Sequence, residues 1–196
     1  MFELWTYVER VLGTCTSDVP MTPGRRLLVR NGRLFFPGGG PVCIYALQSI
    51  LPLLPLKERI SDEEKNSDWL WRVHEAQCPD PKGRVIWRIE QRPLQHAPLP
   101  PATVPTPAHG DLRVTVTAVQ GTCTAGMRAG HYALVRGSSL YLPQPFCLYA
   151  LQAVLPQLPA RQRPLLPDDW MVSDNEVICP DPEGNVIMRI DRVTDV

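Results

Sequence analysis

The sequence has no net charge and no long apolar run, and these two absences exclude several classes of protein. Lys and Arg together number 20, as do Asp and Glu. Residues 1–91 hold 12 basic against 11 acidic side chains, and residues 110–196 hold seven against nine. A basic face that neutralises phosphates is therefore not expected, which argues against a nucleic-acid partner. No apolar run approaches the length of a membrane span, so membrane insertion is not expected either.

The beginning of the chain lacks the marks of a secretory signal. Met1 to Trp5 contain neither a positive region nor an apolar region of the kind that signal peptides have. We therefore expect a cytoplasmic protein, in a compartment where thiols stay reduced and disulfides are rare. The chain has six cysteines, and in that compartment such a number indicates metal or thiol chemistry more often than cross-links.

Local signatures of common chemistry are also missing. No two cysteines are spaced as C-x-x-C, and no glycine loop is suited to cradle phosphate. No Ser-His-Asp set or pair of carboxylates can be assembled from residues that recur along the chain. These absences leave the cysteines as the main chemical feature.

What the sequence does contain is a duplication. Three motifs occur twice, in the same order: Gly-Thr-Cys-Thr, Cys-(Ile/Leu)-Tyr-Ala-Leu-Gln and Cys-Pro-Asp-Pro-(Lys/Glu)-Gly. The offset between the copies is 108 residues from Cys15 to Cys123, 104 from Cys43 to Cys147 and 101 from Cys78 to Cys179. Short deletions in surface loops explain the falling offset. The sequence thus predicts one small domain written twice in tandem.

The boundaries follow from the motifs and from a change in composition. We assign residues 1–91 to the first repeat and 112–196 to the second, each able to bury a small core. Residues 92–111 between them are rich in proline and predict an extended, semi-rigid linker.

The hydrophobic pattern predicts an α+β fold for each repeat. Residues 112–119 alternate apolar and polar side chains, which is typical of a half-buried strand, and residues 4–11 match them less regularly. Hairpins are predicted around Asn31-Gly32 and around Gly137. One short helix is predicted after Pro41, with Pro52 and Pro55 limiting its length.

A second hairpin is expected to close each repeat. Asp80 to Gly83 fit a type I turn, and the strand 84–89 leaves it. Asp68-Trp69 and Asp169-Trp170 are predicted to begin a strand and to anchor the core. Each repeat is then a small antiparallel sheet with one short helix, and the two are expected to pack as a pseudo-symmetric pair.

The cysteines are predicted to lie at the ends of these elements. Cys15 and Cys123 follow the first strand, and Cys43 and Cys147 fall in the first turn of the helix, where free backbone N–H groups favour a thiolate. Cys78 and Cys179 come directly before a proline, as cluster ligands often do. All six are therefore candidate metal and cofactor ligands, three in each repeat.

Three thiolates suit an iron–sulfur cluster, or a zinc ion with one further ligand. Buried cysteines that act as small apolar side chains, and reactive thiols, remain alternatives. The fourth ligand is not assigned, because turn formation accounts for Asp80 and Asp181 and neither His74 nor His131 has a counterpart in the other repeat.

The three motifs resemble those of a family of small, uncharacterised prokaryotic proteins about one repeat in length. The resemblance covers both repeats and leaves out the linker. Members often carry Gly-His before the second strand; Gly130-His131 matches this feature, whereas Gly24-Arg25 departs from it. The resemblance implies a domain identity and no activity.

Our leading hypothesis is a tandem-repeat protein with one metal centre per repeat, most consistent with iron–sulfur, that acts in electron transfer or cluster carriage and meets a redox protein partner. The alternatives are a cofactor-free binding or scaffold module with structural cysteines, and a thiol-based enzyme that uses Cys43 or Cys147.

Overall fold

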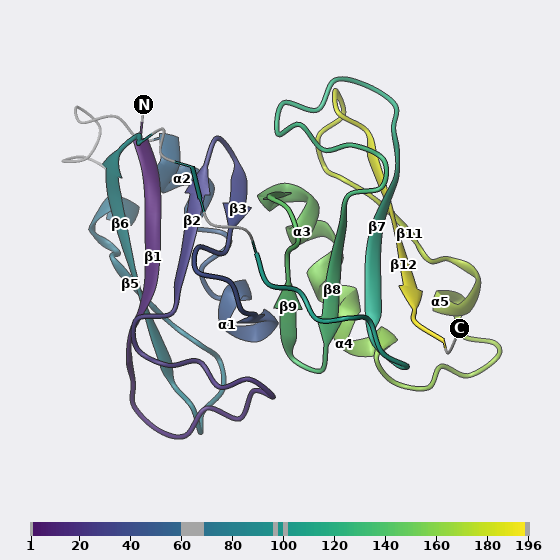
Figure 1. The fold of residues 1–196 in the computed structure, drawn as a ribbon, viewed down its shortest axis with the longest axis horizontal. Coiled ribbons are helices and arrows are strands. Elements are labelled where there is room, and N and C mark those ends of the chain that lie inside the picture. Colours follow the sequence, from purple (N-terminus) through teal and green to yellow (C-terminus); the bar gives the residue numbers. More distant parts are fainter. Residues whose placement is uncertain (1, 60–68, 96–97, 100–101, 195–196) are drawn as a thin grey trace.

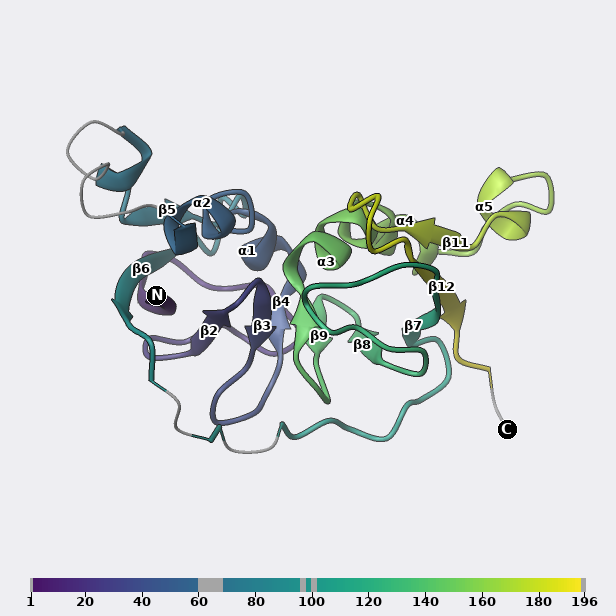
Figure 2. The ribbon, with the colours of Figure 1, turned by 90° about the horizontal axis from the view of Figure 1, so that it is seen from above.

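The computed structural model describes residues 2–59, 69–95, 98–99 and 102–194, and it contains two antiparallel sheets with a few short helices. The sheets lie side by side (Figure 1), with the short helices toward one side and residues 102–110 running along the other (Figure 2). The fold is therefore α+β, as predicted.

Within the described residues, the first half of the chain contributes six strands. They are β1 (Phe2–Val11), β2 (Arg26–Arg30), β3 (Arg33–Phe35), β4 (Val42–Cys43), β5 (Glu75–Gln77) and β6 (Val85–Pro93). The second half contributes β7 (Leu112–Val119), β8 (Tyr132–Arg136), β9 (Ser139–Tyr141), β10 (Phe146–Cys147), β11 (Glu176–Ile178) and β12 (Val186–Arg192).

The helices are all short. The first half has α1 (Ile44–Gln48), α2 (Leu54–Arg59) and the 3₁₀ turn η1 (Trp69–Arg72). The second half has α3 (Leu148–Val154), η2 (Leu155–Gln157), α4 (Leu158–Arg161) and α5 (Trp170–Ser173). The prediction of one helix per repeat was thus too simple. Prolines divide the helical region into short pieces, because they lack an N–H donor and are tolerated only in the first turn.

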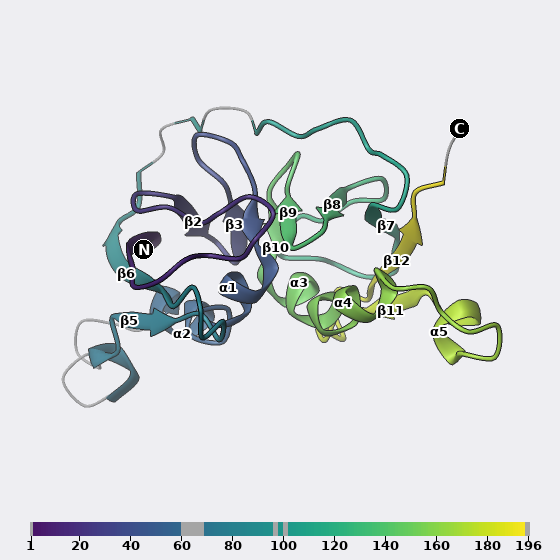
Figure 3. The same cartoon turned by 90° about the horizontal axis from the view of Figure 1, so that it is seen from below.

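Each sheet contains one strand from the other half of the chain. The strand orders are β10-β3-β2-β1-β6-β5 and β11-β12-β7-β8-β9-β4. Strand β4 pairs with β9 through Val42–Leu140 and Cys43–Ser139, and β10 pairs with β3 through Phe146–Leu34 and Cys147–Arg33. The exchanged strands meet where the two sheets adjoin, β4 as labelled in Figure 2 and β10 as labelled in Figure 3.

Backbone hydrogen bonds extend this exchange into the helices. The N–H of Ile44, the first residue of α1, donates to the carbonyl of Ser138 at 2.8 Å. Correspondingly, the N–H of Leu148, the first residue of α3, donates to the carbonyl of Gly32 at 3.0 Å. The start of each helix, one residue after a cysteine, is therefore held by the other half of the chain.

The core is continuous across the two halves. Leu34, Leu140 and Phe146 are fully buried at the exchange, and the same apolar cluster includes residues of both sheets. Trp87 of β6 is also fully buried, and its indole N–H donates to the carbonyl of Ala46 in α1 at 2.9 Å. Burial of apolar area drives this packing, and the hydrogen bond satisfies the polar end of the ring.

A buried carboxylate accompanies the first strand of each half. Glu3 has no exposed surface, and its Oε2 accepts from Nη2 of Arg30 at 2.7 Å. Asp111, one residue before β7, accepts from Nη2 of Arg136 at 2.8 Å. Burial alone would raise the pKa of each carboxyl, but hydrogen bonds, including those from the arginine, outweigh it and hold the pKa below its ordinary value.

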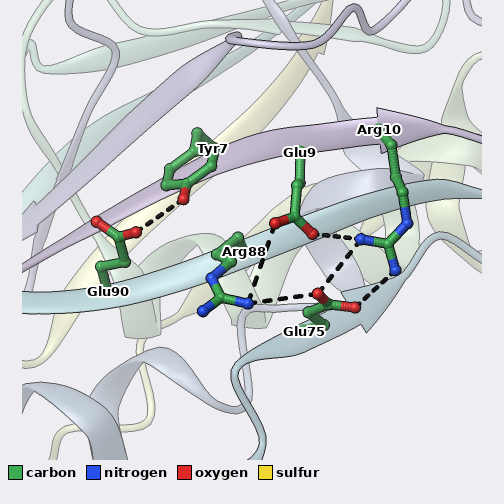
Figure 4. A network of polar contacts seen from close by, with 6 residues as sticks. All are labelled: Tyr7, Glu9, Arg10, Glu75, Arg88 and Glu90. Atoms are coloured by element: carbon green, nitrogen blue, oxygen red, sulfur yellow. Dashed lines mark hydrogen bonds and ion pairs between the residues drawn. The ribbon is translucent and has the colours of Figure 1, made fainter.

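The outer face of the first sheet carries an exposed charged network (Figure 4). Glu75 of β5 accepts from Arg10 at 2.8 Å and from Arg88 at 3.4 Å. Tyr7 donates to Glu90 at 2.7 Å on the same face. These side chains come from three neighbouring strands, and those of the ion pairs are half-exposed, so each ion pair contributes little to stability.

The structure differs from the sequence predictions at Asp169-Trp170 and at the start of the linker. Asp169 begins a helix and not a strand, because its Oδ1 accepts from the N–H of Met171 at 2.9 Å and caps α5. Trp170 is 57% exposed and does not anchor the core. Asp68 lies outside the described residues. Strand β6 extends through Pro93, two residues into the predicted linker.

Candidate functional site

The three cysteines of each half line one pocket. Cys15, Cys43 and Cys78 share a cavity of about 410 Å³, and Cys123, Cys147 and Cys179 share another of about 410 Å³. All six thiols are free, with Cys15 and Cys123 partly exposed and the other four buried. Residues that are distant in the sequence thus line one pocket in each half.

A glycine contact brings the first and third cysteine loops together. The N–H of Gly13 donates to the carbonyl of Gly83 at 3.1 Å, and that of Thr14 donates to Lys82 at 2.9 Å. A Cβ on Gly13 would lie 2.0 Å from the Lys82 carbonyl oxygen, so no side chain fits there. The second half repeats this approach, with a Cβ on Gly121 placed 2.0 Å from the Glu183 carbonyl oxygen.

The turn before each of these contacts is built by an aspartate. Oδ1 of Asp80 accepts from the N–H of Lys82 at 2.9 Å, and its Oδ2 accepts from the hydroxyl of Thr16 at 2.9 Å. Hydrogen bonds from the N–H of Lys82, from Thr16 and from the N–H of Gly83 lower the pKa of Asp80 below its ordinary value. Asp181 makes the matching bond to the N–H of Glu183 at 3.0 Å. These contacts agree with the turn role expected for both aspartates.

Met21 connects Cys15 with Cys43. Its backbone N–H donates to Sγ of Cys15 at 3.4 Å. Its thioether sulfur accepts from the N–H of Cys43 at 3.4 Å. In the second half the thioether of Met127 accepts from the N–H of Cys147 at 3.3 Å. Both methionines are buried, and the sequence analysis missed them because an isolated methionine shows no periodicity.

Cys43 and Cys147 occupy the N-cap positions of α1 and α3. The sequence analysis placed them in the first turn, where it expected the helix end to favour a thiolate. For Cys147 the effect of burial is larger: it raises the pKa of the thiol, although the N–H groups of Ala150 and Tyr149 act in the opposite direction. A helix of seven residues also has a weak dipole.

The third cysteine of each half receives a backbone donor. Sγ of Cys78 accepts from the N–H of Asp80 at 3.5 Å, and Sγ of Cys179 accepts from the N–H of Val186 at 3.2 Å. Burial raises the pKa of Cys78 despite the donor. Such N–H groups would stabilise a thiolate bound to a metal, because they offset negative charge on sulfur.

The pockets do not contain a compact site for one ion. Among the described residues, no group of three His, Cys, Asp or Glu side chains is arranged to hold a metal ion. The three cysteines thus share a pocket without forming a single-ion ligand sphere.

Each pocket also has a tyrosine and residues from the other half. Tyr45 is 42% exposed at the first pocket, beside Ser138. At the second pocket the hydroxyl of Tyr149 accepts from Nη1 of Arg59 at 2.7 Å, and Asn31 is a neighbour. The sequence analysis did not find the contributions across the halves, because strand exchange has no local signature.

No helix in the described parts of the chain is both long and apolar enough to cross a membrane. No family model, curated protein or solved structure matches the chain.

Proposed function

We propose that each cysteine pocket binds one iron–sulfur cluster and that the protein acts in electron transfer or cluster carriage. The observation that carries this proposal is the meeting of three free cysteines, from three separate segments, at one pocket in both halves of the chain. Cys15, Cys43 and Cys78 would hold the first cluster, and Cys123, Cys147 and Cys179 the second. Such a cluster, when bound, supplies one-electron redox chemistry.

A cluster suits these pockets better than a zinc ion for two reasons. Zinc binds sulfur at about 2.3 Å and its structural sites are closed by four ligands, whereas each half repeats only three thiols. One iron of a cluster accepts a ligand other than cysteine.

The competing functions receive less support. A thiol enzyme needs a nucleophile with a lowered pKa, but burial raises the pKa of Cys147. A cofactor-free scaffold accounts for buried cysteines, since they behave as small apolar groups. It does not account for the glycine contacts that hold Cys15 near the Cys78 turn and Cys123 near the Cys179 turn.

The two halves are, in this proposal, copies of one domain packed as a pseudo-symmetric pair. Support comes from the matching strand orders and from the reciprocal exchange of β4 and β10. Matching contacts of Met21 with Cys43 and of Met127 with Cys147 add to it. A tandem copy of a cytoplasmic three-cysteine family, with a protein redox partner, fits this arrangement.

The test is the metal content of the full chain expressed and purified without oxygen. We expect brown protein with broad absorbance near about 400 nm that bleaches on reduction, and with iron and acid-labile sulfide for two clusters. Cys43→Ser should remove half of the iron, and the double variant Cys43→Ser/Cys147→Ser should remove nearly all of it.

Gln48→Ala and Gln152→Ala provide matched controls, because both glutamines are exposed on the same helices and line neither pocket. They should retain full iron. Colourless protein with stoichiometric zinc would show that the pockets hold a structural zinc ion and not a cluster. Colourless protein without metal would favour the scaffold.

A further inference from the structure

A basic turn precedes strand β8 in the second half. The N–H of His131 donates to the carbonyl of Arg128 at 3.0 Å, and Gly130 between them has a φ of +89°. This is the pattern of a type II turn, whose first and last Cα atoms lie less than about 7 Å apart. Arg128 and His131 are therefore neighbours at the two ends of the turn.

Strand exchange brings a second arginine to this turn from the first half. Arg33 lies on β3, which pairs with β10 of the second half. A side chain on Gly126 would collide with Nη2 of Arg33, so the guanidinium rests on the backbone two residues before Arg128. Two arginines and a histidine, from both halves of the chain, thus gather at one place.

The two arginines lack acidic partners. Arg30, which pairs with Arg33 across the β2–β3 hairpin, is bound by Glu3. In the part of the chain that the structure describes, neither Arg33 nor Arg128 takes part in an ion pair. Arg33 is also half-buried, so water screens its charge less than that of an exposed side chain. Positive charges held together in this way favour the approach of an anion.

His131 adds a polar atom without a partner. Its Nδ1 is buried and makes no hydrogen bond with the described residues. Such an atom costs free energy unless a ligand or water satisfies it. Burial, followed by the charges of Arg128 and Arg33, lowers the pKa of His131, and both of these charges are positive. The ring is therefore placed where a negative group is missing.

The first half repeats the turn without the basic cluster. There the N–H of Arg25 donates to the carbonyl of Thr22 at 3.1 Å, in the same geometry. Thr22 stands where the second half has Arg128, and Ser139 stands where it has Arg33. Arg25, in the place of His131, donates to the carbonyl of Gly39 at 3.1 Å. The turn thus forms without these three basic side chains, so folding of the turn does not explain them.

We infer that Arg33, Arg128 and His131 form a binding site for a phosphate group. Two guanidinium groups balance the charge of a dianion, and their planar N–H forks match phosphate oxygens. Nδ1 of His131 supplies a further donor when it carries the proton of the ring. The ligand is a free phosphate ion or the phosphate of a small phosphomonoester. The inference does not rest on the proposed function, because these three side chains line neither cysteine pocket.

The experiment is a calorimetric titration of the full chain with inorganic phosphate, at fixed pH and at an ionic strength held constant with sodium chloride. We expect saturable binding of one phosphate per chain. Arg33→Ser and Arg128→Thr, which copy the residues of the first half, should each weaken binding by about tenfold. Arg128 is exposed, so Arg128→Thr keeps the test valid if Arg33→Ser is unstable. Arg163→Gln is the matched control: this arginine is exposed in the second half and lines a different cavity, so binding should not change.

A second titration, with glycerol phosphate, distinguishes the two sources of the phosphate group. Tighter binding of glycerol phosphate would identify a phosphomonoester, tighter binding of phosphate would identify the free ion, and both results support the site. Lack of saturable binding of either compound, or binding that Arg128→Thr leaves unchanged, would overturn the inference. The iron content of the same samples bears only on the proposed function, so either proposal can fail alone.

Discussion

Gly13 and Lys82 are in direct backbone contact, and a methyl group at Gly13 would lie 2.0 Å from the Lys82 carbonyl oxygen. Gly121 has the same relationship to Glu183, also at 2.0 Å. These contacts explain why glycine precedes Thr-Cys in both motifs. The loop of the first cysteine and the turn of the third can approach each other only where no side chain separates them.

Gly13→Ala should therefore damage the site as well as the fold. We expect a loss of about 1–3 kcal/mol in the free energy of unfolding, since a backbone carbonyl cannot move aside as a side chain can. The iron content of the first pocket should fall with it. Urea unfolding and iron analysis measure the two effects. Thr14→Ala is the control, because it keeps the backbone donor to Lys82; equal losses in both variants would contradict the steric explanation.

The buried and the exposed ion pairs should differ in their contribution to stability. Glu3→Gln leaves Arg30, only 16% exposed, facing a neutral amide, so we expect a loss of about 2 kcal/mol at pH 7. Glu9→Gln removes a carboxylate of the exposed network in Figure 4 and should change stability by less than about 0.5 kcal/mol. Urea unfolding of both variants is the measurement, and similar values would argue against a buried pair.

The Glu3–Arg30 pair should also make the stability of the protein depend on pH in acid. The pKa of Glu3 is lowered in the folded state from an ordinary 4.5. The Glu3 carboxylate thus contributes fully to the free energy of unfolding above pH 4.5. This contribution is lost as the pH falls through the lower, folded-state pKa. The stability difference between the natural protein and Glu3→Gln should shrink over that window. A difference that stays constant down to pH 3 would show that the carboxylate charge is not responsible.

Alkaline pH should weaken the metal-free protein through its buried thiols. Burial raises the pKa of Cys78 and of Cys147 from an ordinary 9.0. A raised folded-state pKa gives a contribution that is complete below pH 9.0 and disappears as the pH rises through the higher value. Urea unfolding should show a steeper loss above pH 9 than in Cys78→Ala/Cys147→Ala. Parallel pH profiles would indicate that these thiols ionise as freely in the fold as in the unfolded chain.

Local patterns in the sequence predicted the strands well and the connections between halves poorly. The alternation in 112–119 gave β7 with its observed bounds, and Asn31-Gly32 marked the turn between β2 and β3. Strands β4 and β10 have only two residues each, so they show no periodicity, and their partners lie about 100 residues away. Arg59 could not be assigned to the second pocket without that exchange.

The cysteine pockets were predictable for a different reason. Duplicated motifs identified the six thiols, and the ends of strands and helices placed them at common edges of the fold. The helix cap at Asp169 was missed because an Asp-Trp pair fits a strand start as well as an N-cap, and only the hydrogen bond to Met171 distinguishes them.

Reciprocal strand exchange should make the two halves unfold together. Residues of both halves form each sheet, and the buried cluster continues between them. We therefore expect one urea transition, with coincident fluorescence and circular dichroism curves. A protease site inserted between Pro98 and Leu99 provides a sharper test. After cleavage the two fragments should still elute together in native buffer and separate only in denaturant, whereas fragments that separate in native buffer would show that the linker, and not the exchanged strands, holds the halves together.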